Sequence, residues 1–310
     1  FGLENIIVIY LAAINVVENV MTIGMLFAFI SYKRQFTDKI SNLVEKFVKF
    51  KMMSLYLQRI GDIVLSECEP DLEGTGLKEQ VQGDVSLRNI TFRYADDLPV
   101  ILENLSCEIK AGSSVAIVGP SGCGKTTLMK IILGLLKPTA GQVLIDGNDI
   151  NKVGLRSYRQ QIGTVMQDDA LFSGTIADNI CFFDHDRDTD YIRKCAEMAA
   201  IHGDIIAMPM GYNSLIGDMG SSLSGGQKQR LLLARALYKK PKIILLDEAT
   251  SHLDTMLETQ INQTIKSLNI TRIVIAHRLE TIESSEKVLV LFNGVITEND
   301  TKEYMSFFKK

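Results

Sequence analysis

The stretch SSVAIVGPSGCGKTTLMKIILGLL, residues 113–136, constrains the fold more strongly than any other part of the sequence. It reads as a short apolar strand, a glycine-rich loop and a helix, which is the context of the phosphate-binding pattern GxxxxGK[ST]. The glycines allow backbone N–H groups to surround phosphate oxygens, while Lys125 can reach the β- and γ-phosphates and Thr126 can offer a hydroxyl to Mg²⁺. An ordinary tight turn is the alternative, and the lysine that opens the helix argues against it.

The sequence around this loop predicts an α/β fold. VSLRNITFRY (85–94) alternates between apolar and polar residues, as a half-buried strand does. KIILLDE (242–248) and RIVIAH (272–277) are short apolar runs, which are typical of strands buried on both faces of a parallel sheet. The pairs Asp146–Gly147 and Asn293–Gly294 predict hairpin turns.

Two carboxylates end the first of these apolar runs. Asp247 and Glu248 follow four apolar residues, and ligands of open α/β sheets bind at the carboxyl ends of the strands. We therefore predict that Asp247 helps to hold Mg²⁺ and that Glu248 orients or deprotonates the attacking water. The alternative is that both acids cap the following helix.

Three further side chains are candidates on weaker grounds. His277 ends the run RIVIAH, near the predicted γ-phosphate, although a lone histidine is more often structural. Gln167 follows IGTVM, and a neutral amide can ligate Mg²⁺ or orient water. Tyr94 precedes the phosphate loop and could stack on adenine, or it could be a core tyrosine at a strand end.

Composition excludes some classes of protein. The net charge is −4 and the pI about 5.7, so no basic face for nucleic acid is indicated. The five cysteines form no CxxC pair, which favours reduced thiols over a disulfide framework or a zinc site.

The N-terminal region carries two uncharged apolar runs, 5–17 and 19–32, separated by Glu18. Each is short for a bilayer span, which needs about 20 residues. They could be two buried helices of a soluble domain or one span with Glu18 near its middle. We favour a cut-off span, a turn around Glu18–Asn19 and a second span that runs onward.

The sequence that follows is consistent with the cytoplasmic end of a membrane domain. Lys33 and Arg34 come directly after the second run, as the positive-inside tendency predicts. Residues 36–65 predict a long amphipathic helix, and 66–80 predict a linker. Phe1 opens directly into apolar sequence, which favours a fragment of a longer chain over a signal peptide.

The combined motifs resemble the nucleotide-binding domain of ATP-binding-cassette (ABC) transporters. GPSGCGKT, Gln167, LSGGQ (223–227), LLDE, SHLD (251–254) and His277 occur in that family's order, over residues 81–310. LSGGQ is the family's signature, and SHLD looks like its D-loop. The implied fold is an α/β P-loop NTPase core with a helical subdomain at about 168–234, preceded by transmembrane and amphipathic helices.

Within that family, two segments look most like the bacteriocin and microcin secretion transporters of the colicin V type. These segments are TIGMLFAFISYKRQFTDKISNLVEKFVKFKMM and IGTVMQDDALFSGTIADNICFF. Residues 1–65 look like the end of an exporter's membrane domain. The resemblance implies peptide export across a bacterial inner membrane, with the bilayer and the exported peptide as partners. The leader-cleaving cysteine peptidase of such transporters does not lie in this sequence.

The resemblance also implies a head-to-tail dimer of two such domains, in which each ATP lies between one chain's phosphate loop and its partner's signature. The implied nucleotide contacts are Tyr94, Gly119, Pro120, Ser121, Gly122, Cys123, Gly124, Lys125, Thr126, Thr127, Ser224, Gly225, Gly226, Gln227 and Asp254. The implied Mg²⁺ ligands are Thr126, Gln167 and Asp247. The implied catalytic residues are Glu248, His277 and Gln167.

Two departures from the family pattern leave this expectation of ATP hydrolysis intact. His252 takes a D-loop position commonly held by alanine, and Cys123 lies inside the phosphate loop. Lipid or drug export is the alternative within the family. A soluble DNA-repair cassette would need a coiled-coil or DNA-binding insertion and a basic surface. A degenerate cassette would lack Lys125 or Glu248.

Overall fold

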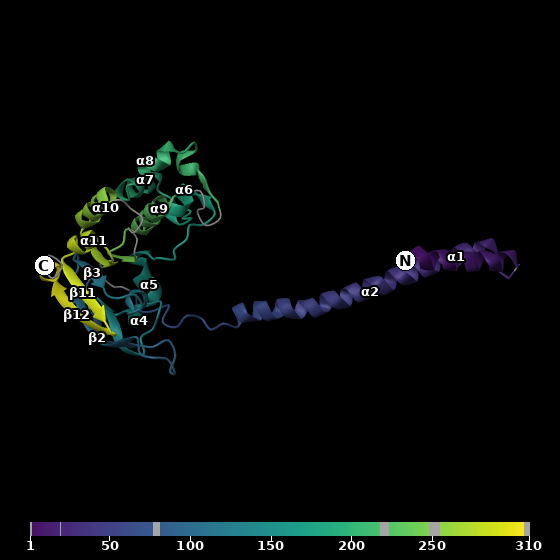
Figure 1. Cartoon of the computed structure of the whole chain (residues 1–310), viewed down its shortest axis with the longest axis horizontal. Coiled ribbons are helices and arrows are strands. Elements are labelled where there is room, and N and C mark those ends of the chain that lie inside the picture. Colours follow the sequence, from purple (N-terminus) through teal and green to yellow (C-terminus); the bar gives the residue numbers. More distant parts are fainter. Residues whose placement is uncertain (1, 19, 77–80, 218–222, 248–254, 307–310) are drawn as a thin grey trace. The chain divides into compact units, whose positions relative to one another are not determined.

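The computed structural model describes residues 2–18, 20–76, 81–217, 223–247 and 255–306, and divides the chain into two units, Phe1–Glu69 and Pro70–Lys310 (Figure 1). Their boundary falls inside the segment 66–80 that the sequence predicts as a linker.

The N-terminal unit consists of α1 (Gly2–Val17) and α2 (Ile23–Val64). Thr22 caps α2 by accepting a hydrogen bond from the Met25 N–H at 3.2 Å. Residues 23–32 of the second apolar run and residues 36–64 of the predicted amphipathic stretch thus belong to one continuous helix, α2. Among the described residues, no helix has both the length and the apolar character needed to cross a membrane.

The described residues of the C-terminal unit form three sheets. The largest has the order β12-β11-β3-β10-β9-β6, and its strands β11, β3, β10, β9 and β6 are parallel neighbours. The second has the order β2-β1-β4-β5 and is antiparallel, and β7 pairs with β8. The strands are β1 Val85–Phe92, β2 Leu102–Ile109, β3 Ser114–Val118, β4 Ala140–Ile145, β5 Asn148–Asp149, β6 Ile162–Val165, β7 Gly174–Thr175, β8 Leu215–Ile216, β9 Ile243–Asp247, β10 Thr271–Ile275, β11 Lys287–Phe292 and β12 Val295–Asp300.

Helices accompany these sheets, and those between β6 and β9 are grouped together (Figure 1). There α9 packs against α6 and α7. The helices of this unit are α3 Lys125–Ile132, α4 Ile150–Val153, α5 Leu155–Gln160, α6 Ile176–Cys181, α7 Thr189–Met198, α8 His202–Ala207, the 3₁₀ turn η1 Gly211–Asn213, α9 Gly225–Tyr238, α10 Thr255–Ser267, α11 Leu279–Glu283 and α12 Thr301–Ser306.

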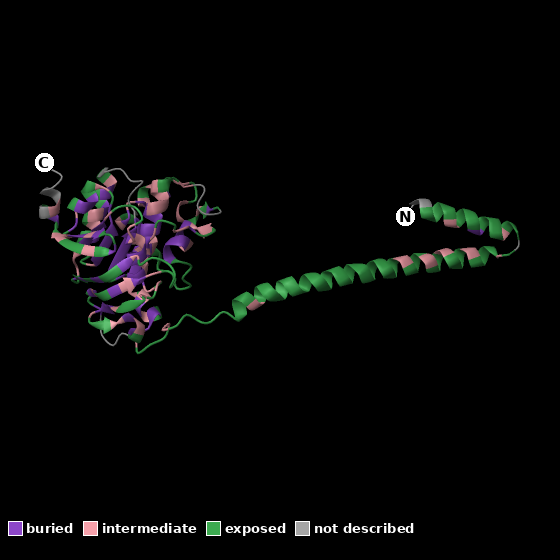
Figure 2. Ribbon diagram, turned by 60° about the horizontal axis from the view of Figure 1, so that its bottom comes forward, coloured by how far each residue is buried: buried purple, intermediate pink, exposed green. Residues whose placement is uncertain are grey.

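The central strands are buried on both faces, as their sequence predicts. Every residue of β9 and β10 is buried, and burial concentrates in the C-terminal unit (Figure 2). One hydrophobic cluster lies toward α6, α7 and α9, and the other lies between the large sheet, α3 and the antiparallel sheet.

Both predicted hairpin turns are confirmed. Asp146 and Gly147 have φ of 47° and 78° between β4 and β5, and Asn293 and Gly294 have φ of 49° and 78° between β11 and β12. Two successive positive φ values are what a two-residue hairpin requires. Asp146 in the first of these turns also accepts hydrogen bonds from the N–H groups of Gln82, Gly83 and Asp84, which lead into β1.

Candidate nucleotide site

The predicted phosphate loop joins β3 to α3. Gly119 begins the loop, and a Cβ atom there would lie 2.2 Å from the backbone oxygen of Leu291 in β11, so only glycine fits without backbone movement. Gly124 caps α3 with φ of 101°, a conformation that favours glycine. The loop therefore presents the N-terminal N–H groups of α3, which is a geometry that suits an anion.

Lys125 lies at the start of α3, with 7% of its surface exposed. Its ammonium group donates hydrogen bonds to the carbonyl oxygens of Gly119 and Pro120, both at 2.9 Å. The side chain thus curls back over the loop, and the positive charge lies where the sequence predicts phosphate.

Thr126 and Asp247 are brought together across the sheet. The Thr126 hydroxyl donates to Asp247 Oδ2 at 3.0 Å, and Asp247 is 2% exposed at the end of β9. A hydroxyl and a carboxylate beside a phosphate loop fit Mg²⁺, which is usually held by one or two carboxylates together with substrate phosphates. Two of the three side chains predicted to bind Mg²⁺, those of Thr126 and Asp247, therefore lie next to each other.

Strand order places the remaining core candidates at the same edge of the sheet. Gln167 follows β6, Asp247 ends β9, His277 follows β10 and Gly119 follows β3, and these four strands are parallel neighbours. Gln167 and His277 are both exposed. Glu248 and the SHLD segment, including His252 and Asp254, lie outside the described residues.

Tyr94 lies beside the first turn of α3. Its hydroxyl is 3.2 Å from the Thr127 hydroxyl, and its ring makes an edge-to-face contact with Phe92 at 5.0 Å between centroids. The residue is 54% exposed. It is therefore not the core tyrosine of the alternative interpretation, and an exposed, oriented ring can stack on a nucleotide base.

The signature segment forms the N-terminus of α9. Ser224 accepts a hydrogen bond from the Gln227 N–H at 3.2 Å, and the Gln227 side chain accepts one from the Ser224 N–H at 3.0 Å. This reciprocal pair is a capping box. Gly225 and Gly226 form the first turn, where the helix dipole is positive.

Sequence reasoning missed the residues that support this cap. Asp204 in α8 accepts hydrogen bonds from Gln227 and Arg230. Burial would raise the pKa of Asp204, but those hydrogen bonds and the charge of Arg230 outweigh it and lower that pKa. Arg230 lies three residues after Gln227, so the signature motif itself points to it in the sequence. No nearby motif points to Asp204, which lies 23 residues before Gln227.

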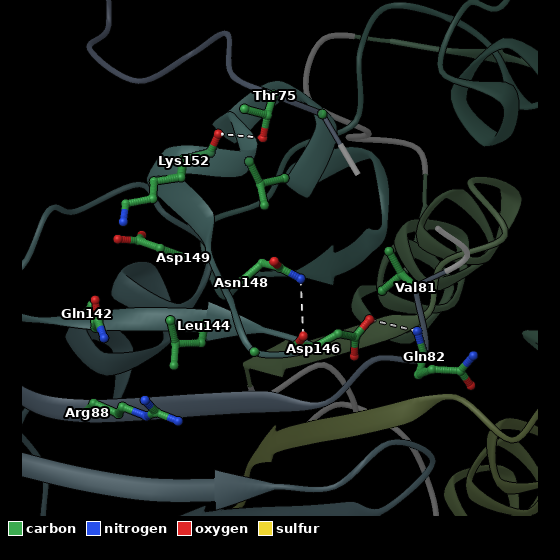
Figure 3. A pocket seen from close by; sticks show the side chains of 13 residues that line it. Thr75, Val81, Gln82, Arg88, Gln142, Leu144, Asp146, Asn148, Asp149 and Lys152 are labelled. Carbon is green, nitrogen blue, oxygen red and sulfur yellow. Dashed lines mark hydrogen bonds between the residues drawn. The ribbon is translucent and has the colours of Figure 1, made fainter. Parts of the chain in front are cut away.

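A cavity of about 770 Å³ lies elsewhere, beside the β4–β5 hairpin (Figure 3). There Asp146 accepts a hydrogen bond from the Gln82 N–H at 2.8 Å, and Lys152 O accepts one from Thr75 at 3.1 Å. The lining contains none of the residues predicted to bind nucleotide. This cavity is therefore separate from the candidate site.

Comparison with known proteins shows which family the C-terminal part of the chain resembles. Residues 102–251 match the ABC transporter family. The chain contains an ABC transporter domain. It is 45% identical over 291 residues to the colicin V secretion/processing ATP-binding protein CvaB of Escherichia coli, which covers 92% of this chain and 41% of CvaB. It is 43% identical over 289 residues to the probable microcin-H47 secretion/processing ATP-binding protein MchF of Escherichia coli, with the same coverages.

A solved structure titled as a bacterial Atm1-family ABC exporter with ATP bound has a TM-score of 0.76 and 36% identity to this chain. The match covers 83% of this chain and 46% of that one. The chain thus spans less than half the length of these relatives.

Proposed function

We propose that this chain binds ATP with Mg²⁺ and hydrolyses it to drive export of a bacteriocin- or microcin-like peptide across a bacterial inner membrane. The single observation that carries the ATPase proposal is the meeting of Lys125, Thr126 and Asp247 at the carboxyl edge of the parallel sheet. That arrangement offers a cation and helix N–H groups to phosphate and oxygen ligands to the metal.

In this proposal each residue at the strand ends has a separate catalytic or binding role. Glu248 deprotonates or orients the attacking water, His277 contacts the γ-phosphate, and Gln167 orients water or completes the metal ligands. Tyr94 stacks on the base. The loop residues Gly119–Thr127 enclose the phosphates, and bound Mg²⁺ would neutralise the charge that develops on them.

The proposed partner is a second copy of the chain, arranged head to tail. The N-terminus of α9 exposes Ser224 and Gly225, and a positive helix end favours an anion. With Asp254, residues Ser224–Gln227 would contact the ATP bound by the partner's phosphate loop. Closure of the dimer would exclude water and complete the site.

The proposed cargo and membrane location rest on the relatives, whose names describe colicin V and microcin secretion. We assign 81–310 to the ATPase domain, about 168–234 to its helical subdomain, 66–80 to a linker and 1–65 to the end of a membrane domain. The relatives favour peptide over lipid or drug cargo.

Two variants of the purified chain test the proposal. Glu248→Gln should bind ATP and accumulate a closed dimer, and wild-type turnover would remove Glu248 as catalytic base. Lys125→Ala should weaken ATP binding roughly 10- to 100-fold, since a charged hydrogen bond contributes about 1.5–3 kcal/mol. Retained tight binding would refute the loop assignment.

The shared site is tested by mixing. Heterodimers of Lys125→Ala and Ser224→Arg, isolated with two affinity tags, keep one intact composite site. ATPase activity should return relative to either homodimer. An inactive heterodimer would refute the sharing of ATP between subunits.

A further inference from the structure

The cap of α9 is anchored from outside the helix. Gln227 uses its side-chain oxygen to accept the Ser224 N–H, and its side-chain nitrogen donates to Asp204 Oδ1 at 2.9 Å. Both polar ends of the Gln227 side chain are therefore engaged within the chain. Because Asp204 belongs to the first turn of α8, this contact ties the signature segment to a separate helix.

The second oxygen of Asp204 reaches further along α9. Oδ2 accepts a hydrogen bond from Arg230 at 2.9 Å, and the Arg230 side chain is 9% exposed. Arg230 also donates to Gly226 O at 3.4 Å and to Ala200 O. One carboxylate thus neutralises a buried guanidinium and restrains Gln227, while the guanidinium holds the carbonyl of the second signature glycine.

We propose that Asp204 is a positioning residue for the signature segment Ser224–Gln227, acting through Gln227 and Arg230. This inference rests on the proposed shared site. Without Asp204, the Gln227 amide loses its external hydrogen bond, and the Arg230 guanidinium loses its counter-charge. The first turn of α9 can then rotate, which misaligns the Ser224 hydroxyl and the glycine N–H groups that serve the partner's ATP.

The first experiment separates positioning from ATP affinity. Asp204→Ala should lower kcat roughly 10- to 100-fold, the scale expected for misplacement of a catalytic group by about 1 Å, while ATP affinity of the chain's own phosphate loop stays within twofold. Asp204→Asn keeps an oxygen for Gln227 and should recover part of kcat. Unchanged kcat in Asp204→Ala, or an equal loss of ATP affinity, would overturn the proposal.

Glu197→Ala is the matched control. Glu197 pairs with Arg193 at 3.0 Å in α7, and both side chains are exposed, so this variant also removes a carboxylate from an arginine pair in the same group of helices. Its kcat and thermal midpoint should equal those of wild type. A loss of kcat equal to that of Asp204→Ala would reduce the role of Asp204 to general stability and overturn the proposal.

The second experiment asks which subunit needs Asp204. A heterodimer of Asp204→Ala with Lys125→Ala keeps one composite site with both Lys125 and an anchored signature. A heterodimer of wild type with the Asp204→Ala, Lys125→Ala double variant keeps none. The first should hydrolyse ATP roughly 10- to 100-fold faster.

The reverse order of rates, or equal rates, would overturn the proposal, since Asp204 would then not act on the partner's site. The mixture of Lys125→Ala with Ser224→Arg separates this failure from failure of the shared site. If that mixture is active, only the positioning role of Asp204 is refuted. If it is inactive, both the sharing of ATP between subunits and the positioning role of Asp204 are refuted.

Discussion

Replacement of Gly119 by alanine tests the geometry of the phosphate loop most directly. The added Cβ would lie 2.2 Å from Leu291 O and 2.8 Å from the Cys123 sulfur. Leu291 belongs to β11, which pairs with β3 up to Val118, so the clash is with backbone and no side-chain rotation relieves it. Overpacking of this kind costs about 3 kcal/mol. For a unit of this size, that lowers the thermal midpoint by about 6–12 °C.

Gly122→Ala provides the control inside the same loop. Gly122 has φ of 77°, yet nothing lies within 4 Å of its Cβ position, so only the left-handed backbone is penalised, by about 1 kcal/mol. Its midpoint should fall by about 2–4 °C. Both proteins are followed by circular dichroism on heating and by ATP titration. A Gly119→Ala midpoint equal to or above that of Gly122→Ala, with ATP affinity retained, would refute the close approach of the loop to β11.

Two further predictions concern buried groups. The Glu258 side chain is 3% exposed and accepts a hydrogen bond from Arg278 at 3.2 Å. Glu258→Gln should lower the free energy of unfolding in urea by about 1–2 kcal/mol, and it should reduce ATPase activity through His277, which precedes Arg278 in the sequence. An unchanged urea midpoint would contradict a stabilising contribution of this ion pair. Burial raises the pKa of Cys107 to about 12, whereas Cys68 is exposed. A thiol reagent at pH 8 should label Cys68 and spare Cys107 until urea unfolds the chain, because the Cys107 thiolate stays scarce below its pKa; equal labelling rates in the native protein, read by peptide mass, would show Cys107 to be accessible.

The parts of the fold that could be predicted from sequence are those with local causes. The loop Gly119–Thr126 requires glycine at fixed positions, and the hairpins at Asp146–Gly147 and Asn293–Gly294 require positive φ. The loop and both hairpins can therefore be recognised from residues that are adjacent in the sequence. The buried strands were predictable for a similar reason, because burial on both faces demands an unbroken apolar run. Such constraints act within a few residues of the chain.

The anchoring of the signature could not be predicted, because its partners are remote. Asp204 lies 23 positions from Gln227 and 26 from Arg230, and only tertiary packing brings α8 to α9. In the N-terminal region, the sequence predicted two separate segments, and the structure joins them. No proline interrupts the sequence between the apolar run 19–32 and the amphipathic stretch 36–65, so one helix, α2, continues from Ile23 to Val64.

The two helix N-termini of the candidate site, at α3 and α9, have a consequence for the proposed dimer. The loop before α3 and the cap of α9 each present a helix N-terminus, equivalent to roughly half a positive charge, and the first also carries Lys125. Placed face to face, these ends repel each other. Lys125 is meanwhile held by two carbonyl oxygens of its own loop, which phosphate oxygens can replace. A triphosphate bound between the two helix ends would accept the hydrogen bonds of Lys125 and would also neutralise the repulsion between the ends. Closure of the proposed dimer should therefore depend on the γ-phosphate, and the dimer should weaken once that phosphate leaves.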